Sequence, residues 1–314
     1  MKIAFIDFIF ENKNLIKLEN CRIDIAPPFS DLSALIQFAE GCDILCGRDQ
    51  FLKWDKVLIA SLPKLKCIVT RSTGYDHIDW KYAAEQGIPV CNVPGYGRNT
   101  IAEFAMGLAL NVMRHVPIVA QRYRNRDYSI EGIKGFDLKG KIAGIVGTGA
   151  IGQEMIKICQ GFSMDVIAHD SFPNINLQKQ LNFTYVSFDE LISSSDLISI
   201  HIPLTSKTFH MFDRKEFEKM KPTTVFINTG RGELVNTEAL ILALKKNQIY
   251  GAGLDVIENE RKKTYNFDGL NAIVTTHMAW YTEEAIARIT EISLSNIRSF
   301  ITGTLQNCIN KHLL

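Results

Sequence analysis

Short apolar runs alternate with amphipathic segments over the first hundred residues, and this pattern is typical of an α/β protein. The runs are rich in Ile and Val, as buried parallel strands are. Strands are predicted at 2–7, 21–26, 43–47, 66–71 and 88–93. Helices are predicted between them at 31–40, 54–61 and 78–86. This alternation indicates a parallel sheet with helices on both faces.

A second α/β block follows a long segment from Thr100 to His115, which is apolar nearly all round and is therefore expected to be a deeply buried helix. Strands are predicted after it at 142–146, 165–169, 197–201, 224–228, 249–255 and 272–276, and a final helix at 283–302. We expect two doubly wound parallel-sheet domains, 1–98 with 283–314 and 99–282. A cleft between them would hold a cofactor and a small substrate.

The middle block begins with a glycine-rich turn after an apolar strand. Gly147, Gly149 and Gly152 have the spacing G-x-G-x-x-G, which is typical of a dinucleotide-binding turn. Gly147 would allow the tight turn, Gly149 the approach of a pyrophosphate, and Gly152 close packing of helix and strand. The helix that follows would present its free N–H groups to the phosphates. Its predicted buried face contains Ile151, Met155, Ile158, Cys159 and Phe162.

Asp170 ends the next strand, eighteen positions after Gly152. A carboxylate there can accept hydrogen bonds from the adenosine ribose hydroxyls and would repel a 2′-phosphate. The predicted cofactor is therefore NAD rather than NADP. The alternative is that Asp170 caps a helix or lies in a solvated turn.

Composition and charge exclude several classes of function. The chain has 314 residues, 46% of them hydrophobic, and a net charge of +1, so neither nucleic acid nor an anionic membrane should attract it. The basic run of Arg122, Arg124 and Arg126 is interpreted as a subunit interface or a solvated segment. No signal peptide or bilayer-spanning stretch is recognisable.

The seven cysteines are scattered, and no CxxC pair occurs among them. We therefore expect buried free thiols in a reducing cytoplasm. No grouping of His and Cys suggests a metal site.

Three candidate catalytic residues stand at predicted strand ends, where open parallel sheets bind their ligands. Arg231 follows FINTG, Glu260 follows GLDVIEN, and His277 follows AIVTT. Arginine can hold a carboxylate with its fixed fork, histidine can exchange a proton near neutral pH, and a carboxylate can orient the histidine. Together they suit carbonyl reduction. Alternatively, Arg231 caps a helix, Glu260 belongs to a solvated loop and His277 is a satisfied buried histidine.

At these residues the chain resembles the D-isomer-specific 2-hydroxyacid dehydrogenase family, and most closely its D-lactate dehydrogenase branch. The resemblance covers nearly the whole chain. The matching motifs are STGYDHID (72–79), NVPGYGRNTIAEFA (92–105), GTGAIG (147–152), HIPLTSKT (201–208), INTGRGELV (227–235), GAGLDVIENE (251–260) and TTHMAWYTEEA (275–285).

The resemblance implies a flavodoxin-like substrate domain, a Rossmann NAD-binding domain and a role for each matching residue. Arg231 would bind the substrate, and His277 would be the acid/base with Glu260 as its partner. The remaining implied substrate-binding residues are Thr73, Gly74, Tyr75, Tyr96 and Trp280.

The implied NAD contacts lie on the glycine turn and on later strand ends. Asp255 would bond the nicotinamide carboxamide, with Thr229 against the same ring. The other implied cofactor-binding residues are Gly147, Gly149, Ala150, Ile151, Gly152, Asp170, His201 and Pro203. His201 is expected to have no catalytic role, and no metal is expected. The resemblance also implies a homodimer.

The chain departs from the family pattern at three positions. Ala150 removes a side-chain contact to the pyrophosphate, and Arg261 replaces a proline after Glu260. Trp280 is larger than the usual phenylalanine. It would either reduce the space for the substrate side chain or only pack at the domain hinge. Phe51 is a further candidate for contact with the substrate side chain.

The predicted function is reversible, NAD-dependent reduction of a small 2-oxo acid, with pyruvate and D-lactate as the first choice. The alternatives are a dehydrogenase for glyoxylate, hydroxypyruvate, phosphoglycerate or phosphite on the same scaffold, and an NAD(H)-responsive binding protein.

Overall fold

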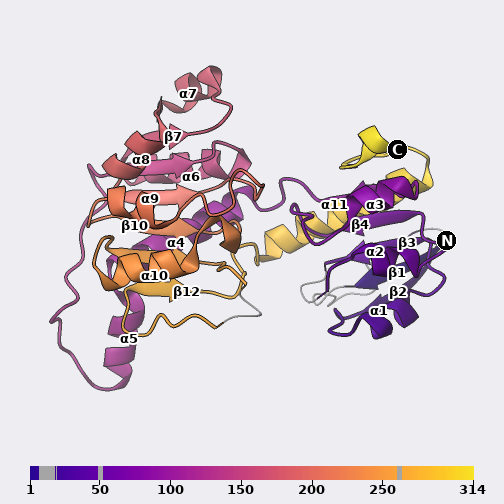
Figure 1. Cartoon of the computed structure of the whole chain (residues 1–314), viewed down its shortest axis with the longest axis horizontal. Coiled ribbons are helices and arrows are strands. Elements are labelled where there is room, and N and C mark those ends of the chain that lie inside the picture. The colour runs from indigo at the N-terminus through magenta and orange to yellow at the C-terminus, as the bar shows by residue number, and fades with distance from the viewer. Residues whose placement is uncertain (7–17, 19, 49–51, 260–263) are drawn as a thin grey trace. The chain divides into compact units, whose positions relative to one another are not determined.

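The structure, a computed structural model, describes residues 1–6, 18, 20–48, 52–259 and 264–314. The described chain divides into two compact units. The first unit contains Met1–Tyr96 and Thr282–Leu314, and the second contains Gly97–Tyr281. Each unit has its own parallel sheet with helices on both faces, so the predicted α/β fold class is confirmed (Figure 1).

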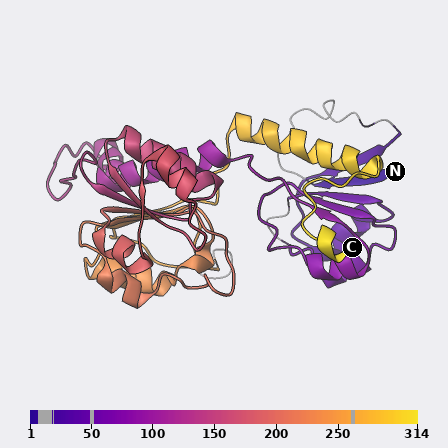
Figure 2. The same cartoon turned by 90° about the horizontal axis from the view of Figure 1, so that it is seen from above.

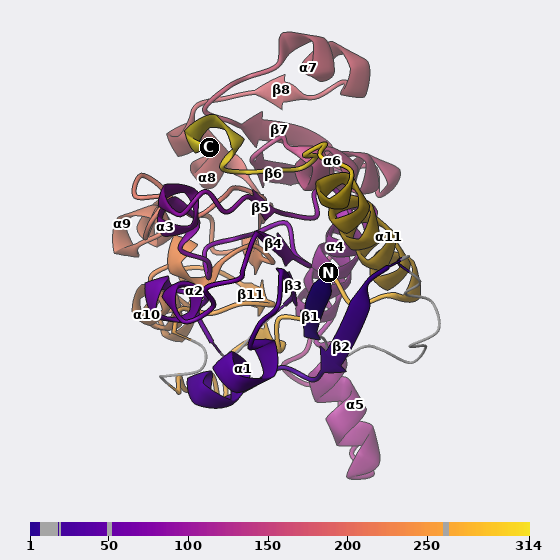
Figure 3. The ribbon, with the colours of Figure 1, turned by 90° about the vertical axis from the view of Figure 1, so that its right-hand side faces the viewer.

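The first unit is built on a five-stranded parallel sheet in the order β2-β1-β3-β4-β5, which can be followed in Figure 3. The strands are β1 (Lys2–Ile6), β2 (Arg22–Ala26), β3 (Ile44–Gly47), β4 (Cys67–Thr70) and β5 (Val90–Cys91). The helices are α1 (Leu32–Ala39), α2 (Lys56–Ala60), α3 (Trp80–Glu85) and α11 (Glu283–Ile301), and a 3₁₀ turn, η3 (Lys311–Leu313), ends the chain.

Aspartates set the N-termini of the short helices in this unit. The Asp31 carboxylate accepts a hydrogen bond from the Ala34 amide, and Asp79 accepts one from the Tyr82 amide. Asp55 likewise accepts from Val57 and Leu58, so α2 begins later than the predicted residue 54.

Successive side chains along the strands of the first sheet point to opposite faces, and this alternation produces two apolar cores. Ile3 and Phe5 face α11, whereas Ala4 and Ile6 face α1 to α3. Figure 2 shows α11 along one face of this sheet and the short helices on the other. The C-terminal helix thus completes the first unit, although most of the chain between the two parts folds elsewhere.

The second unit is built on a seven-stranded parallel sheet in the order β12-β11-β10-β9-β6-β7-β8. The strands are β6 (Ile142–Val146), β7 (Asp165–His169), β8 (Thr184–Tyr185), β9 (Leu197–Ile200), β10 (Val225–Asn228), β11 (Gly251–Leu254) and β12 (Ala272–Val274). The helices are α4 (Arg98–Met113), α5 (Val116–Arg124), α6 (Ala150–Gly161), α7 (Ile175–Leu181), α8 (Phe188–Ser194), α9 (Arg214–Lys219), α10 (Thr237–Lys245) and the 3₁₀ turn η2 (Gly232–Leu234).

Helices cover both faces of this second sheet (Figure 2). α4 and α6 pack on one face, where Ala105, Ala109 and Met155 are buried. α8, α9 and α10 pack on the other, where Phe217 and Leu240 are buried. Among the described residues, no helix is both long enough and apolar enough to cross a membrane.

The predicted buried face of α6 is wrong at its end. Met155 and Cys159 are fully buried as predicted, but Phe162 is 40% exposed. The helix ends at Gly161, and Phe162 is its C-cap, so the helical periodicity no longer turns this side chain toward the core. Ile156, which was not predicted, is buried in its place.

Candidate active site

Three neighbouring strands of the second sheet bring two predicted catalytic residues, Arg231 and His277, and one predicted cofactor residue, Asp255, to one edge. Arg231 lies after β10, Asp255 immediately after β11, and His277 after β12. The strands pair in parallel, with Asn228 opposite Leu254 and Leu254 opposite Val274. Two strand spacings, about 10 Å, therefore separate the Arg231 and His277 strands.

The turn at His277 is held by hydrogen bonds from the neighbouring strand. His277 has φ of +58°, which a side chain with Cβ rarely adopts without support. Its N–H donates to the Asp255 carbonyl at 2.9 Å. The indole N–H of Trp280 donates to the His277 carbonyl at 3.0 Å. The left-handed conformation is thus fixed on both sides of the residue.

The Asp255 carboxylate completes this support. It is fully buried and accepts hydrogen bonds from the Thr275 hydroxyl at 2.6 Å, the Met278 amide at 2.8 Å and the Ala279 amide at 2.8 Å. Asp255 was predicted to bond the nicotinamide carboxamide. In this structure its carboxylate forms hydrogen bonds within the His277 turn. Its contact with the cofactor stays a prediction.

The Arg231 loop is held by Asn228 and by a close backbone approach. Asn228 donates from its amide to the Arg231 carbonyl at 2.8 Å and accepts from the Gly230 amide at 3.0 Å. An added Cβ at Gly232 would lie 2.1 Å from the Ile257 carbonyl carbon. This position therefore requires glycine, and the Arg231 loop packs directly on the segment that leads to Glu260.

Glu260 itself lies outside the described residues, as do Arg261 and Phe51, so its predicted role stays a prediction. The segment before it is anchored by Glu258, whose carboxylate lies 2.9 Å from Nε2 of His210. The His210 amide in turn donates to the Glu233 carbonyl, two residues after Arg231. His210 therefore links the segments that contain Glu233 and Glu258, and no sequence motif singled it out.

The glycine turn has the geometry that its spacing predicts. Gly147 has φ of +94°, and an added Cβ there would lie 2.5 Å from the His201 carbonyl oxygen. At Gly152 the added Cβ would lie 2.0 Å from the Gly147 carbonyl oxygen. At Gly149 it would meet no atom within 4 Å. Gly147 and Gly152 are thus required by the protein itself, whereas Gly149 faces open space.

The open space at Gly149 lies at the N-terminus of α6. No side chain caps this helix, so its first-turn amides are available to an anion. Ala150 is exposed and Ile151 is half-buried in this turn. The position and chemistry fit a pyrophosphate.

Asp170 is oriented by Thr148, the residue between the first two glycines. Oδ2 of Asp170 accepts from the Thr148 amide at 2.7 Å and its hydroxyl at 2.9 Å, and Oδ1 accepts from the Phe172 amide at 2.9 Å. Partial burial raises the pKa of Asp170, but the hydrogen bonds from Thr148 and Phe172 outweigh it and hold the pKa below its usual value. The carboxylate is thus charged and pre-oriented, as ribose binding requires.

Tyr185 supports this arrangement from β8. Its hydroxyl lies 2.8 Å from that of Thr148 and accepts from the Asn174 amide at 3.2 Å. Neither Thr148 nor Tyr185 could be assigned from the sequence, because the bonds join residues 37 positions apart.

The remaining predicted cofactor residues lie along the same sheet edge. The Thr229 hydroxyl is buried and has no hydrogen-bond partner among the described residues, so it can pair with a bound group. Pro203 is exposed. Nε2 of His201 lies 2.9 Å from the Ser199 hydroxyl, and burial of the ring lowers the pKa of His201 to about 4. His201 is therefore neutral near pH 7 and does not act as a proton donor there.

The predicted substrate-binding residues Thr73, Gly74 and Tyr75 lie in a loop after β4 in the first unit. Within the described chain, the amides of Thr73, Gly74 and Tyr75 donate no hydrogen bond. The loop is nevertheless fixed by two hydrogen bonds. The Thr73 hydroxyl donates to the Val93 carbonyl at 2.8 Å, and the side-chain amide of Asn92 donates to the Thr73 carbonyl at 2.8 Å. The three backbone amides are therefore available to an anion such as a carboxylate.

Tyr96 and Trp280 are both largely buried. The Tyr96 carbonyl accepts a hydrogen bond from Nε of Arg288 at 2.6 Å, which fixes the end of the first unit's N-terminal part. Trp280 is 9% exposed and packs edge-on against Tyr281, with ring centroids 5.4 Å apart.

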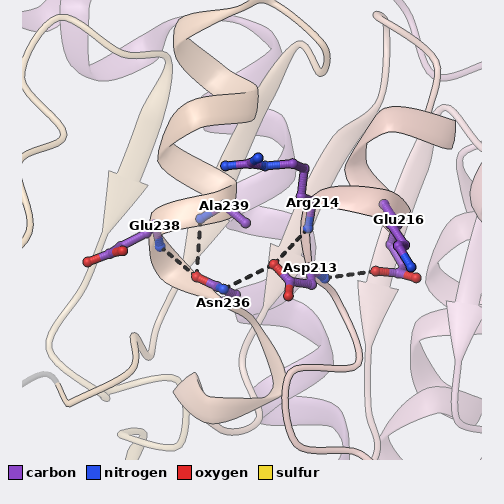
Figure 4. A pocket seen from close by; sticks show the side chains of 7 residues that line it. Asp213, Arg214, Glu216, Asn236, Glu238 and Ala239 are labelled. Carbon is purple, nitrogen blue, oxygen red and sulfur yellow. Dashed lines mark hydrogen bonds between the residues drawn. The ribbon is translucent and has the colours of Figure 1, made fainter.

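A cavity of about 600 Å³ lies elsewhere on the second unit, beside the N-termini of α9 and α10. Figure 4 shows that its polar groups bond to one another: Asn236 donates to Asp213 at 3.0 Å, and both side chains cap their own helices. None of the predicted site residues lines it. We therefore assign no ligand to this cavity.

Comparison with known proteins identifies the family. The sequence model "D-isomer specific 2-hydroxyacid dehydrogenase, NAD binding domain" matches residues 106–279, more than half of the chain. The chain belongs to this family. The glycine turn, Asp170 and Thr229 all lie within the NAD-binding domain so defined, and the family and the cofactor predicted from the sequence are confirmed.

Relatives of this dehydrogenase carry more than one activity. A glyoxylate reductase of Thermococcus litoralis is 38% identical, with 83% of this chain and 82% of that protein covered. A D-lactate dehydrogenase of Escherichia coli is 35% identical, with 87% of each covered. Among solved structures, D-lactate dehydrogenase of Aquifex aeolicus with NAD and lactic acid is 28% identical, covers 96% of each chain and has a TM-score of 0.82.

Proposed function

We propose that this NAD-dependent dehydrogenase reduces a small 2-oxo acid, with pyruvate as the best candidate, to the D-2-hydroxy acid. The observation that carries the proposal is the edge of the second sheet. There, Arg231 follows β10 and His277 follows β12 at the same edge, and Asp255 and Trp280 hold the His277 turn by hydrogen bonds.

In this proposal each side chain has one task. The Arg231 guanidinium holds the substrate carboxylate and polarises the adjacent carbonyl. A ring nitrogen of His277 donates a proton to the carbonyl oxygen, and Glu260 favours the protonated ring. NADH supplies the hydride when it is bound. In the reverse direction His277 removes the hydroxyl proton.

The substrate carboxylate has a second proposed anchor in the first unit. The amides of Thr73, Gly74 and Tyr75 are not used by the described chain, and their loop is held in place through Asn92. Tyr96 is proposed to line the same substrate site. The proposal thus assigns substrate binding to 1–98 with 283–314 and NAD binding to 99–282.

Trp280 supports the choice of a small substrate. Its indole is anchored to the His277 carbonyl, so the bulky ring is held near the acid/base. In this proposal the ring limits the space for the substrate side chain, which favours a methyl group or a hydrogen over a long side chain. Glyoxylate is the second candidate, because a glyoxylate reductase is among the relatives.

The test is NADH oxidation by the purified protein with pyruvate, glyoxylate, hydroxypyruvate and longer 2-oxo acids, with NADPH in parallel. We expect the highest kcat/KM with pyruvate and NADH, and D-lactate as the product. Faster turnover of glyoxylate or hydroxypyruvate would keep the mechanism and change the substrate. NADH binding without turnover of any 2-oxo acid would contradict the proposal; phosphoglycerate and phosphite would be tested next, before a binding protein is considered.

We also propose a homodimer formed through the second unit. Helix α5 has no buried residue, and Val116, Ile118 and Val119 are each more than 40% exposed. Tyr128 and Ile130, in the segment after it, are 76% and 84% exposed. An apolar surface of this kind marks an interface. Sedimentation of the wild type and of an Ile130→Glu variant tests it, with a monomeric wild type contradicting the proposal. The cytoplasmic location stays a prediction.

A further inference from the structure

Four cysteines that are far apart in the sequence meet on one face of the first sheet. Cys46 on β3, Cys67 on β4 and Cys91 on β5 lie in the apolar core that includes Leu294 and Ile297 of α11. Cys308, which follows α11, packs against the same core. None of the seven cysteines forms a disulfide.

Cys91 and Cys308 face each other across an antiparallel backbone pairing. The Ile309 amide donates to the Val90 carbonyl at 2.9 Å, and the Asn92 amide donates to the Asn307 carbonyl at 3.0 Å. These bonds flank the two cysteines, which therefore form the non-hydrogen-bonded pair of an antiparallel ladder. In such a pair the Cα atoms lie about 4.5 Å apart with the side chains on the same face. Disulfides span Cα separations of about 4.4–6.8 Å, so the backbone already permits the bond.

The two thiols differ in exposure and in acidity. Cys91 is fully buried, whereas Cys308 is partly exposed. Hydrogen bonding from the Cys67 thiol, with a further contribution from Cys308, lowers the pKa of Cys91 against the effect of burial. Burial raises the pKa of Cys308. Cys308 is thus the more accessible of the two residues to an oxidant, and Cys91 is the more acidic.

Cys67 is a weaker partner for either thiol. It is fully buried, and the residue paired with Cys91 on β4 is Val69, not Cys67. Among the described residues, no group of three or more His, Cys, Asp or Glu could hold a metal ion. Cys67 also contacts Cys91 from the neighbouring strand, but only Cys308 combines partial exposure with a backbone position directly opposite Cys91.

We propose that Cys91 and Cys308 are an oxidisable thiol pair that hydrogen peroxide converts into a disulfide. The Cys308 sulfur attacks one peroxide oxygen, the O–O bond breaks, and a sulfenic acid and one water result. The Cys91 thiolate then attacks the Cys308 sulfur, and the hydroxyl leaves as a second water with the Cys91 proton. Two thiols are oxidised to one disulfide while one peroxide is reduced to two waters.

The disulfide would fasten the C-terminal segment to β5. That segment already docks there, because the Asn310 carboxamide accepts from the Val90 amide at 2.9 Å and donates to the Ile88 carbonyl at 3.0 Å. A covalent bond between residues so distant in sequence should raise the Tm of the first unit, by about 5 °C. The inference concerns the first unit alone and does not depend on the proposed substrate.

Peptide mapping of the full-length protein tests the pairing directly. Trypsin places Cys67, Cys91 and Cys308 in separate peptides, 67–71, 82–98 and 299–311. After treatment with a small excess of hydrogen peroxide and alkylation of the remaining thiols, we expect peptides 82–98 and 299–311 to be joined. Dithiothreitol should separate them and reverse the rise in Tm.

Matched variants identify the residues responsible. Cys308→Ser and Cys91→Ala should abolish the cross-link and the rise in Tm, whereas Cys21→Ser, at another partly exposed cysteine, should retain both. A cross-link between 67–71 and 82–98 would overturn the assignment. Oxidation of Cys308 to a sulfinic acid with Cys91 still alkylatable would overturn it too. Peptide mapping of the oxidised wild-type protein identifies the paired cysteines even if Cys91→Ala does not fold.

Discussion

The two turns that carry the chemistry of the second sheet are stabilised in different ways. The glycine turn after β6 depends on the absence of side chains, because a Cβ at Gly147 or Gly152 would strike backbone atoms. The His277 turn after β12 depends on a side chain from another strand, because Asp255 binds the amides of Met278 and Ala279. A turn of the first kind is encoded within six residues of sequence. A turn of the second kind needs the sheet to be assembled first.

Removing the His277 ring should have the largest effect on activity. We expect His277→Ala to lower kcat about 10²–10⁴-fold, because the proposed proton donor is lost. NADH affinity, measured by fluorescence titration, should stay near the wild-type value because the glycine turn is intact. His312→Ala, at an exposed residue near the C-terminus, is the matched control. Near-normal kcat in His277→Ala would remove this residue from the mechanism.

Asp255→Asn should weaken the hydrogen bonds that hold the His277 turn. One acceptor oxygen becomes a donor, so at least one of the amides of Met278 and Ala279 or the Thr275 hydroxyl loses its partner. Displacing His277 by about 1 Å would lower kcat about 10²-fold. NADH titration separates the two roles of Asp255: an unchanged Kd indicates support of the turn, whereas a weakened Kd indicates a bond to the nicotinamide. Asp268→Asn, at an exposed aspartate, should change neither quantity.

A pair of glycine variants tests the other turn. Gly152→Ala forces a Cβ against the Gly147 carbonyl oxygen, so we expect a loss of about 1–3 kcal/mol of stability together with weaker NADH binding. Gly149→Ala meets no protein atom, so its Tm should be unchanged while its Kd for NADH rises about tenfold, or ~1.4 kcal/mol. Equal NADH affinity in Gly149→Ala and wild type would mean that no phosphate approaches this residue.

Asp170, next to the glycine turn, should affect both the preference for NADH over NADPH and the stability of the protein at low pH. Asp170→Asn removes the charge that would repel a 2′-phosphate, so the ratio of NADH to NADPH affinity should fall. The pKa of Asp170 is lowered on folding, so the charged form stabilises the folded chain fully above the unfolded pKa of about 3.9. This contribution is lost as the pH falls through the lower, folded pKa. An unchanged NADPH affinity in Asp170→Asn would refute the role of the charge.

Trp280→Phe should have the smallest effect. The variant keeps an aromatic ring but loses the hydrogen bond to the His277 carbonyl, which is worth about 0.5–1.5 kcal/mol. We expect kcat with pyruvate to fall up to about tenfold, while longer 2-oxo acids gain in kcat/KM relative to pyruvate. An unchanged ratio of kcat/KM between long and short substrates would show that Trp280 only stabilises the His277 turn.

Much of the fold could be predicted because its signals are local. The strands are short apolar runs, and helices α1, α2 and α3 each follow an aspartate that caps them. Errors occur at the ends of elements, as at Phe162, where a helix ends one residue before the periodicity does. The places of Arg231 and His277 after β10 and β12 could likewise be predicted, whereas their chemical roles stay proposals.

The hydrogen bonds that hold the site residues in place could not be predicted in the same way. Thr148, Tyr185 and His210 act through hydrogen bonds to residues 22 to 48 positions away. Asp255 was assigned a cofactor contact, whereas the structure shows its carboxylate on the His277 turn. No periodicity or motif reports such bonds, because each depends on which strands become neighbours.

The sequence by itself determined the two parallel sheets and the glycine turn, and it supplied the residues that are proposed to carry the chemistry. Steric exclusion at glycines and apolar alternation act between near neighbours in the chain, so they can be recognised in a single sequence. Only the tertiary structure decided that Asp255 supports His277 and that Cys91 lies opposite Cys308. Hydrogen bonds and thiol pairs act over a few ångströms in space, and the sheet order determines which distant residues come that close.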